Sequence, residues 1–368
     1  MTNGTGLAVR AWLMVLTAVA PASPAWACGA AGPRNEPVAV ASESAIIVWD
    51  EATKTQHFIR RASFRTGAKD FGFLVPTPAR PTLAEADDGA FALLARVTAP
   101  RMVTQAAPAG GGCTFGCGGS APQGAPAPAV EVLEEKRVAG YDAAVLRADD
   151  PAALGAWLQA RGYDDSPAIR DWVKPYVEAK WTVTAFKVAM ADPAAPTAAT
   201  SAVRMSFPTE RPFFPYREPD STSVVPDQVR LLRVYVVAAG PVQGTLTARP
   251  PDRPGRNDAD RGTFPIVWAN SLPPDGRPDL ARLLALPAGA VPADAYVTEF
   301  ENRHFDRGSA GDAYFTPDPG RRPVERRPHV RYTTRFEDTG GGFCIVFAAL
   351  AVACLVIRRA SRMAPPRP

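Results

Sequence analysis

Lysine and histidine are scarce in this chain of 368 residues, and the scarcity bounds its chemistry. Of the 41 basic residues, six are lysine and the others are arginine, and the 3 histidines stand far apart in the sequence. Because histidine is the commonest general base near neutral pH, isolated copies leave little material for acid–base catalysis. The net charge of +4 is too small to indicate nucleic-acid binding, and we expect no nucleic-acid partner.

Catalytic motifs are also missing. The chain has no G-x-S-x-G elbow, no H-E-x-x-H, no P-loop, and no G-x-G-x-x-G after a strand. Three carboxylate pairs each precede a predicted helix, where capping explains them better than catalysis does: Asp87-Asp88, Asp149-Asp150 and Asp164-Asp165. His57 lies in a predicted strand, as a structural histidine would. The catalytic residues therefore stay unknown, and the sequence predicts no cofactor.

Glycine and proline, 29 and 39 residues, make up less than a fifth of the chain, which allows a globular body. With 46% hydrophobic and 21% charged residues, the chain is not disordered throughout. Long apolar runs occur at its two ends alone, so the sequence does not indicate a polytopic membrane protein.

The first 27 residues have the pattern of a cleaved signal peptide. Arg10 precedes an apolar run over residues 11–20, and the small-x-small triplet at residues 25–27 follows. A buried N-terminal helix is the alternative, and Pro21 argues against it. We predict export with cleavage after Ala27. Cys28 would then be the first residue, which leaves lipidation at Cys28 as an alternative outcome.

Residues 340–358 have the pattern of a transmembrane or sorting segment. Residues 343–357 carry no charge, follow three glycines and precede two arginines. At about 1.5 Å per residue the uncharged run spans roughly 22 Å, so a helix would need the glycines to cross a bilayer core of about 30 Å. The arginines predict a cytoplasmic tail over residues 359–368 and an extracytoplasmic body, periplasmic or at the cell surface.

The order of glycines, apolar run and arginines also resembles the C-terminal sorting signals of Gram-negative bacteria, the GlyGly-CTERM type and its cysteine-bearing myxobacterial counterpart. Cys344 occupies the corresponding cysteine position. The resemblance implies that the tail is cut and the body is released or re-anchored. A plain stop-transfer anchor remains equally compatible with the pattern.

Between the ends, the sequence predicts an α+β body with mixed or antiparallel sheets and a few packed helices. Its strand-rich first part, residues 28–98, contains a hairpin, a third strand ending at Pro76 and a helix over residues 89–97. An α+β part follows over residues 130–302, with helices starting at Pro151 and Pro167. A Pro- and Arg-rich stalk is predicted over residues 303–339, including Arg321, Arg322, Arg326, Arg327, Arg331 and Arg335.

A Gly- and Pro-rich loop or linker over residues 99–129 separates the two parts of the body. It contains Cys113 and Cys117, which in an exported protein favour a small disulfide, with Cys28 as a competing partner. Zinc is the alternative, but it needs four ligands, and no histidine stands at ligand spacing. We predict no metal site.

Several segments of the body resemble the bacterial family called "domain of unknown function 2330". The resemblance covers residues 28–240, and the family brings no established activity, substrate or catalytic residue. The segments that carry it are CG at 28–29, FGFLVPTP at 71–78, RVAGYDAAVL at 137–146, LGAWLQARGY at 154–163, YVEAKW at 176–181 and VRMSF at 203–207.

Three functions fit these observations. The first, which we favour, is a non-enzymatic, membrane-anchored envelope protein whose ectodomain is structural or binds an envelope partner. The second is an extracytoplasmic, hydrolase-like enzyme, which would require His57 within about 3.2 Å of a buried carboxylate or hydroxyl in a cleft. The third is an anionic-surface binder that uses the basic stalk.

Overall fold

The computed structural model describes residues 30–33, 38–106, 131–163, 165–189, 197–219, 231–248, 263–303 and 310–333. The predicted signal peptide, the C-terminal apolar segment and the cysteines Cys28, Cys113, Cys117 and Cys344 lie outside these residues. The chain divides into two units, one made of Met1–Ala99 and Gly116–Arg326 and the other of Pro100–Phe115 and Arg327–Pro368.

The first unit is an α+β body, as the sequence predicts. The described part of the chain contains four helices, and its sheets are mostly antiparallel. The helices are α1 (Gly89–Val97), α2 (Pro151–Gln159), α3 (Pro167–Glu178) and α4 (Gly276–Leu283). None of the described helices is both long enough and apolar enough to cross a membrane.

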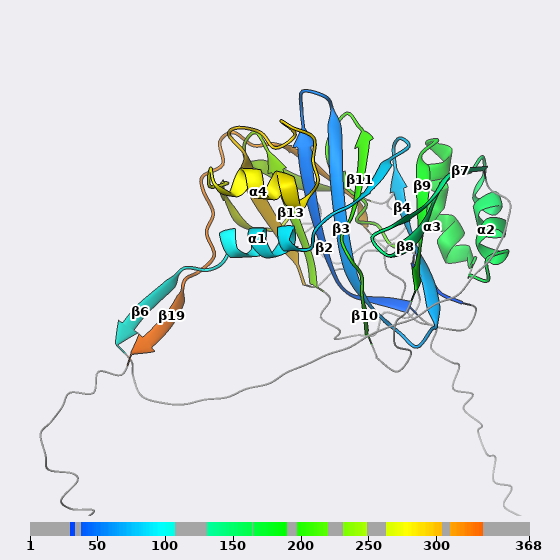
Figure 1. Ribbon diagram of the computed structural model, residues 1–368, viewed down its shortest axis with the longest axis horizontal. Coiled ribbons are helices and arrows are strands. Elements are labelled where there is room, and N and C mark those ends of the chain that lie inside the picture. The colour runs from blue at the N-terminus through cyan, green and yellow to red at the C-terminus, as the bar shows by residue number, and fades with distance from the viewer. Residues whose placement is uncertain are drawn as a thin grey trace, which may run out of the picture. The chain divides into compact units, whose positions relative to one another are not determined.

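An eight-stranded sheet forms the centre of the body (Figure 1). Its hairpin, β2 (Val38–Asp50) and β3 (Thr55–Thr66), confirms the predicted strand pair, with a turn at residues 51–54. β13 pairs with β2 in parallel, and the other pairings are antiparallel. The remaining strands are β5 (Thr82–Glu85), β10 (Thr197–Ala199), β11 (Val203–Pro208), β13 (Leu231–Ala238), β16 (Ile266–Ser271) and β17 (Tyr296–Asn302).

A five-stranded sheet packs beside it in the order β1-β4-β9-β8-β7. Ala139 and Gly140 join β7 to β8 with φ of 52° and 81°, the pair of positive values that a type I′ hairpin turn requires. The strands are β1 (Ala30–Ala31), β4 (Asp70–Thr77), β9 (Thr182–Ala189), β8 (Tyr141–Arg147) and β7 (Glu131–Val138).

A four-stranded sheet corrects the predicted stalk. Its strands are β12 (Phe213–Phe214), β18 (Ala310–Pro317), β14 (Val242–Ala248) and β15 (Thr263–Phe264). β18 lies in the segment that the sequence assigns to a stalk, yet it pairs with β12 and β14. Its alternating buried side chains, Ala313 and Phe315, join the core, so the body extends beyond residue 303.

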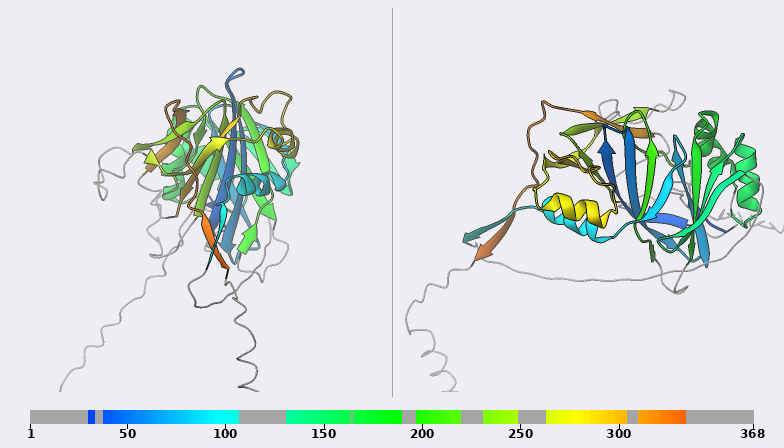
Figure 2. Two further views of the ribbon diagram at one scale, coloured as in Figure 1. Left: turned by 90° about the vertical axis from the view of Figure 1, so that its left-hand side faces the viewer. Right: turned by 45° about the horizontal axis from the view of Figure 1, so that its top comes forward.

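Three apolar clusters hold these layers together. The largest joins side chains of all three sheets, including the stacked rings of Phe73 and Phe186 with centroids 4.8 Å apart. A second cluster packs α2 and α3 on the five-stranded sheet, and a third packs α1 and α4 on the eight-stranded sheet (Figures 1 and 2). The helices therefore cover outer faces, while the sheets share the central core.

Candidate functional site

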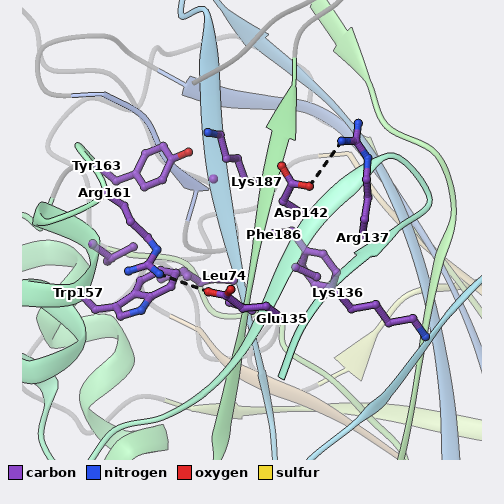
Figure 3. Close-up of a pocket in the computed structure, with 15 residues that line it drawn as sticks. Leu74, Glu135, Lys136, Arg137, Asp142, Trp157, Arg161, Tyr163, Phe186 and Lys187 are labelled. Carbon is purple, nitrogen blue, oxygen red and sulfur yellow. Dashed lines mark hydrogen bonds and ion pairs between the residues drawn. The ribbon is translucent and has the colours of Figure 1, made fainter. Parts of the chain in front are cut away.

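A cavity of about 500 Å³ lies on the face of the five-stranded sheet that α2 partly covers (Figure 3). Two rows of side chains cross the strands in register to form its floor. The first row is Leu74, Ala185, Ala144 and Glu135, and the second is Gly72, Lys187, Asp142 and Arg137.

The floor is hollow because its central residues are small. Ala144 and Ala185 are register partners on β8 and β9, and Gly72 of β4 faces Lys187. Farther along the same strands, larger apolar side chains, Leu146 and Val183, fill the space under the helices. The sheet face thus changes from apolar beneath α2 and α3 to charged at the open end.

The end of α2 and the turn after it form the wall. Asp150 caps the helix by accepting a hydrogen bond from the Ala153 N–H at 2.9 Å, and Gly162, with φ of 80°, ends the turn. Tyr163 then donates its N–H to the Leu158 carbonyl at 3.0 Å. This cap and turn fix Trp157, Leu158, Arg161 and Tyr163 against the cavity.

Arg161 occupies the centre of the wall. Its guanidinium lies over the Trp157 ring, 3.8 Å from the centroid, and its Nη2 donates to Glu135 Oε1 at 3.4 Å (Figure 3). Stacking and ion pairing together orient the guanidinium. Within the described part of the chain, Arg161 Nη1 is buried and has no hydrogen-bond partner.

The Tyr163 hydroxyl is another unsatisfied group, and Trp157 Nε1 is a third among the lining residues. Tyr163 exposes 4% of its surface, and no described residue hydrogen-bonds its hydroxyl, which points toward Lys187 in Figure 3. Burial, reinforced by the charges of Asp70 and Asp142, raises the pKa of Tyr163 well above its usual range. The phenol therefore stays protonated and can donate a hydrogen bond.

The rim carries charges of both signs. Lys187 Nζ lies 3.6 Å from Oδ2 of the buried Asp70, and Arg137 Nη1 lies 3.9 Å from Asp142 Oδ1 at the solvent-exposed edge. The lining residues include no histidine, cysteine or serine. The cavity has the size and the mixed polar and apolar lining of a small-molecule site.

His57 lies elsewhere, on β3. Its Nδ1 is 2.8 Å from Ser206 Oγ on the neighbouring strand β11. His57 exposes 4% of its surface, and burial lowers its pKa, so the neutral ring is favoured. Within the described residues, no hydrogen bond or ion pair joins His57 to the predicted carboxylate pairs.

Those pairs act locally where they are described. Asp87 Oδ1 accepts the Gly89 N–H at 2.7 Å at the start of α1, Asp150 caps α2, and Asp165 accepts a hydrogen bond from Gln159. Among the described residues, no group of three or more histidine, cysteine, aspartate or glutamate side chains could hold a metal ion. The candidate disulfide and lipidation cysteines, Cys28, Cys113, Cys117 and Cys344, lie outside the part of the chain that the structure describes.

Sequence reasoning did not single out Arg161, Tyr163 or Lys187 as site residues. Trp157 belongs to the apolar cluster under α2 and α3, and it also lines the cavity. The segment LGAWLQARGY at 154–163 could have indicated the site, because it contains Trp157, Arg161 and Tyr163. The lysine and the floor residues become neighbours through sheet register alone.

The fold and cavity define an α+β domain with a ligand-sized pocket on one covered sheet. A family model described as "Uncharacterized protein conserved in bacteria (DUF2330)" matches residues 21–314, and the chain belongs to this family. The match extends the resemblance inferred from residues 28–240 to most of the body, including part of β18. A search of curated proteins gave no significant match.

Proposed function

We propose that this chain is an exported, membrane-anchored protein of the bacterial cell envelope whose body is a non-enzymatic binding module. The signal-peptide pattern before Cys28 and the apolar run at residues 343–357 support export and anchoring.

The observation that carries the binding role is the group of buried donors at the cavity, of which Tyr163 and Arg161 are the polar members that the test uses. Tyr163 Oη and Arg161 Nη1 lack partners among the described residues, although a buried polar group without a hydrogen bond is costly. A ligand in the cavity would satisfy them. Small side-chain shifts would bring both donors to a ligand in the cavity, whose volume suits a small molecule or a single side chain of a partner.

An extracytoplasmic enzyme is the second candidate, and one observation favours it. His57 and Ser206 lie at 2.8 Å, within the range that a nucleophile and its base require. His57 is nevertheless buried, Ser206 is half-buried, and neither residue lines the cavity described above. The binding role is favoured because the cavity and its buried donors lie elsewhere, on the five-stranded sheet.

Binding is tested with the full chain in nanodiscs. Native mass spectrometry reports co-purified ligands, and saturation-transfer NMR tests a panel of amino acids, dicarboxylates and sugar acids. We expect binding that Arg161→Gln and Tyr163→Phe abolish and that the exposed control Arg147→Gln leaves unchanged. Binding that is equal in all variants, or absent for every probe, would overturn the pocket's role.

Export and anchoring are tested separately by mass spectrometry of the protein from membrane and medium fractions. We expect an N-terminus at Cys28 and a C-terminus at Pro368 in the membrane fraction. A chain still beginning at Met1 would disprove export. A chain cut within residues 340–358 would replace the anchor with a sorting signal.

A further inference from the structure

The second unit contains a two-stranded ribbon. β6 (Met102–Ala106) pairs in parallel with β19 (His329–Thr333), with Met102 opposite His329 and Ala106 opposite Thr333 (Figure 1). No further described strand pairs with either one. Parallel pairing is slightly less stable per residue than antiparallel pairing, and an isolated pair of strands is marginal in water. The ribbon therefore needs a surface to support it.

Large apolar side chains are exposed on this ribbon. Met102 exposes 64% of its surface, Val103 39% and Val330 37%, and Val103 and Val330 are register partners. These are three of the four exposed large hydrophobic residues in the described chain, and Val132 of β7 is the fourth. Such a concentration on a few residues is the mark of an interaction surface.

The same short strands and their approaches are basic. Arg101, Arg327 and Arg331 are exposed, and residues 100–106 and 327–333 contain no aspartate or glutamate. Arg321 and Arg326, in the same predicted stalk, are half-buried and form ion pairs with Asp318 and with Glu299 and Glu301 of the body. The exposed positive charge thus continues along the ribbon rather than along the whole predicted stalk.

We infer that this ribbon lies on a bilayer surface that carries anionic phospholipid headgroups. The inference rests on the proposed membrane anchor. Nine residues lie between Thr333 and Phe343, a reach of about 36 Å at most, so an anchored chain holds the ribbon close to the headgroups. Guanidinium groups pair with lipid phosphates, and Val103 and Val330, which share one face of the ribbon, enter the interface beside them, with Met102 at the end of the ribbon.

Charge complementarity favours a lipid surface over a second copy of the chain. Two ribbons packed face to face would bring their arginines together without carboxylates to neutralise them, and like charges across an interface are unfavourable. An anionic membrane provides the opposite charge and an apolar layer beneath it.

The test uses the full chain in vesicles, with a protease site inserted at Gly341. The uncleaved chain reports anchoring by flotation. After cleavage, retention of the body reports the ribbon, and this readout is independent of whether the anchor spans the bilayer. Vesicles of phosphatidylcholine alone are compared with vesicles that also contain phosphatidylglycerol, at low and high salt.

We expect the cleaved body to stay on the anionic vesicles and to leave them at high salt. Each Arg→Gln change at 101, 327 or 331 should lower the partition coefficient about fivefold. The triple variant Met102→Ser, Val103→Ser, Val330→Ser should lower it at least tenfold, while Val132→Ser and Arg147→Gln, as matched controls, should not. Full release of the cleaved body from anionic vesicles would overturn the inference, and so would equal retention on neutral vesicles. A dimer of the body that the triple variant loses would also overturn it, because the ribbon would then bind a second copy of the chain.

Discussion

The Tyr176 hydroxyl donates a hydrogen bond to Asp312 Oδ1 at 2.9 Å and so joins helix α3 to strand β18. Asp312 Oδ1 also accepts the Arg217 N–H at 3.3 Å. Burial raises the pKa of Asp312 to about 6, and the hydrogen bonds only partly offset this effect. The body therefore holds a carboxyl group that resists ionisation.

This pKa predicts how stability depends on pH. Because the folded state keeps the proton that the unfolded state releases, the contribution of Asp312 to stability falls as pH rises from about 4 to about 6. We expect Asp312→Asn to gain about 3 kcal/mol relative to the wild type over this range. Urea unfolding at pH 4, 5, 6 and 7 measures the difference between the two proteins. A difference that does not change with pH would contradict the prediction.

Arg326 should hold the segment after β18 on the body. Its Nη2 donates to Glu299 Oε1 at 2.7 Å and to Glu301 Oε2 at 2.9 Å, and Glu299 is fully buried. We expect Arg326→Gln to cost about 1 to 3 kcal/mol of unfolding free energy, whereas the exposed neighbour Arg322→Gln costs almost nothing. Equal effects in denaturant unfolding would show that the ion pairs contribute little.

Glu301 gives the same ion-pair network a pH dependence. Burial raises the pKa of Glu301, but hydrogen bonds from Arg326, Arg233 and Arg303 outweigh burial and lower it to about 2. The stability that Glu301 contributes is present above its ordinary pKa and is lost as pH falls toward 2. Arg326→Gln should flatten this acid limb. NMR titration of the Glu301 carboxyl in both proteins measures the shift, and an unchanged pKa would contradict the assignment.

Two buried tyrosines provide a matched comparison for the cavity. The Tyr141 hydroxyl donates to the Ser201 carbonyl at 2.5 Å, whereas no described residue bonds the Tyr163 hydroxyl. Tyr141→Phe should cost about 1 kcal/mol, and Tyr163→Phe should be neutral or stabilising without ligand. Thermal unfolding measures both. A loss at Tyr163 as large as that at Tyr141 would show that the hydroxyl is already satisfied.

Gly311 tests whether β18 belongs to the body. A Cβ at this position would lie 1.9 Å from the Thr247 carbonyl oxygen on β14, while Gly320 has no atom within 4 Å of such a Cβ. Gly311→Ala should destabilise the body by about 3 kcal/mol or more, and Gly320→Ala by little. If both variants unfold at the same denaturant concentration as the wild type, β14 and β18 do not pair as described.

Local signals in the sequence predicted most helices and hairpins correctly. Asp150 and Pro151 start α2 as expected, and the spacing of Ile169, Trp172 and Val173 matches the buried face of α3. Caps and periodicity depend on neighbours in the chain, so they can be read without the fold. Pro76 was wrongly expected to end its strand. Pro76 lies within β4, where its register partner is Val183 of β9. On the other side of β4, β1 pairs only with Phe73 and Gly72, so no described strand there requires the N–H that Pro76 lacks.

The sequence alone determined the α+β class, the family and the positions of α1, α2 and α3, because composition and short-range spacing suffice for these. Tertiary structure alone decided that β18 belongs to the body, that His57 meets Ser206, and that Arg161, Tyr163 and Lys187 line one cavity. Each of these depends on strand pairings between segments distant in sequence, and side-chain period does not specify which strands pair. The scarce histidines and lysines illustrate this division. The sequence gives their number, but only the fold buries His57 in a sheet and places Lys187 in the lining of the cavity.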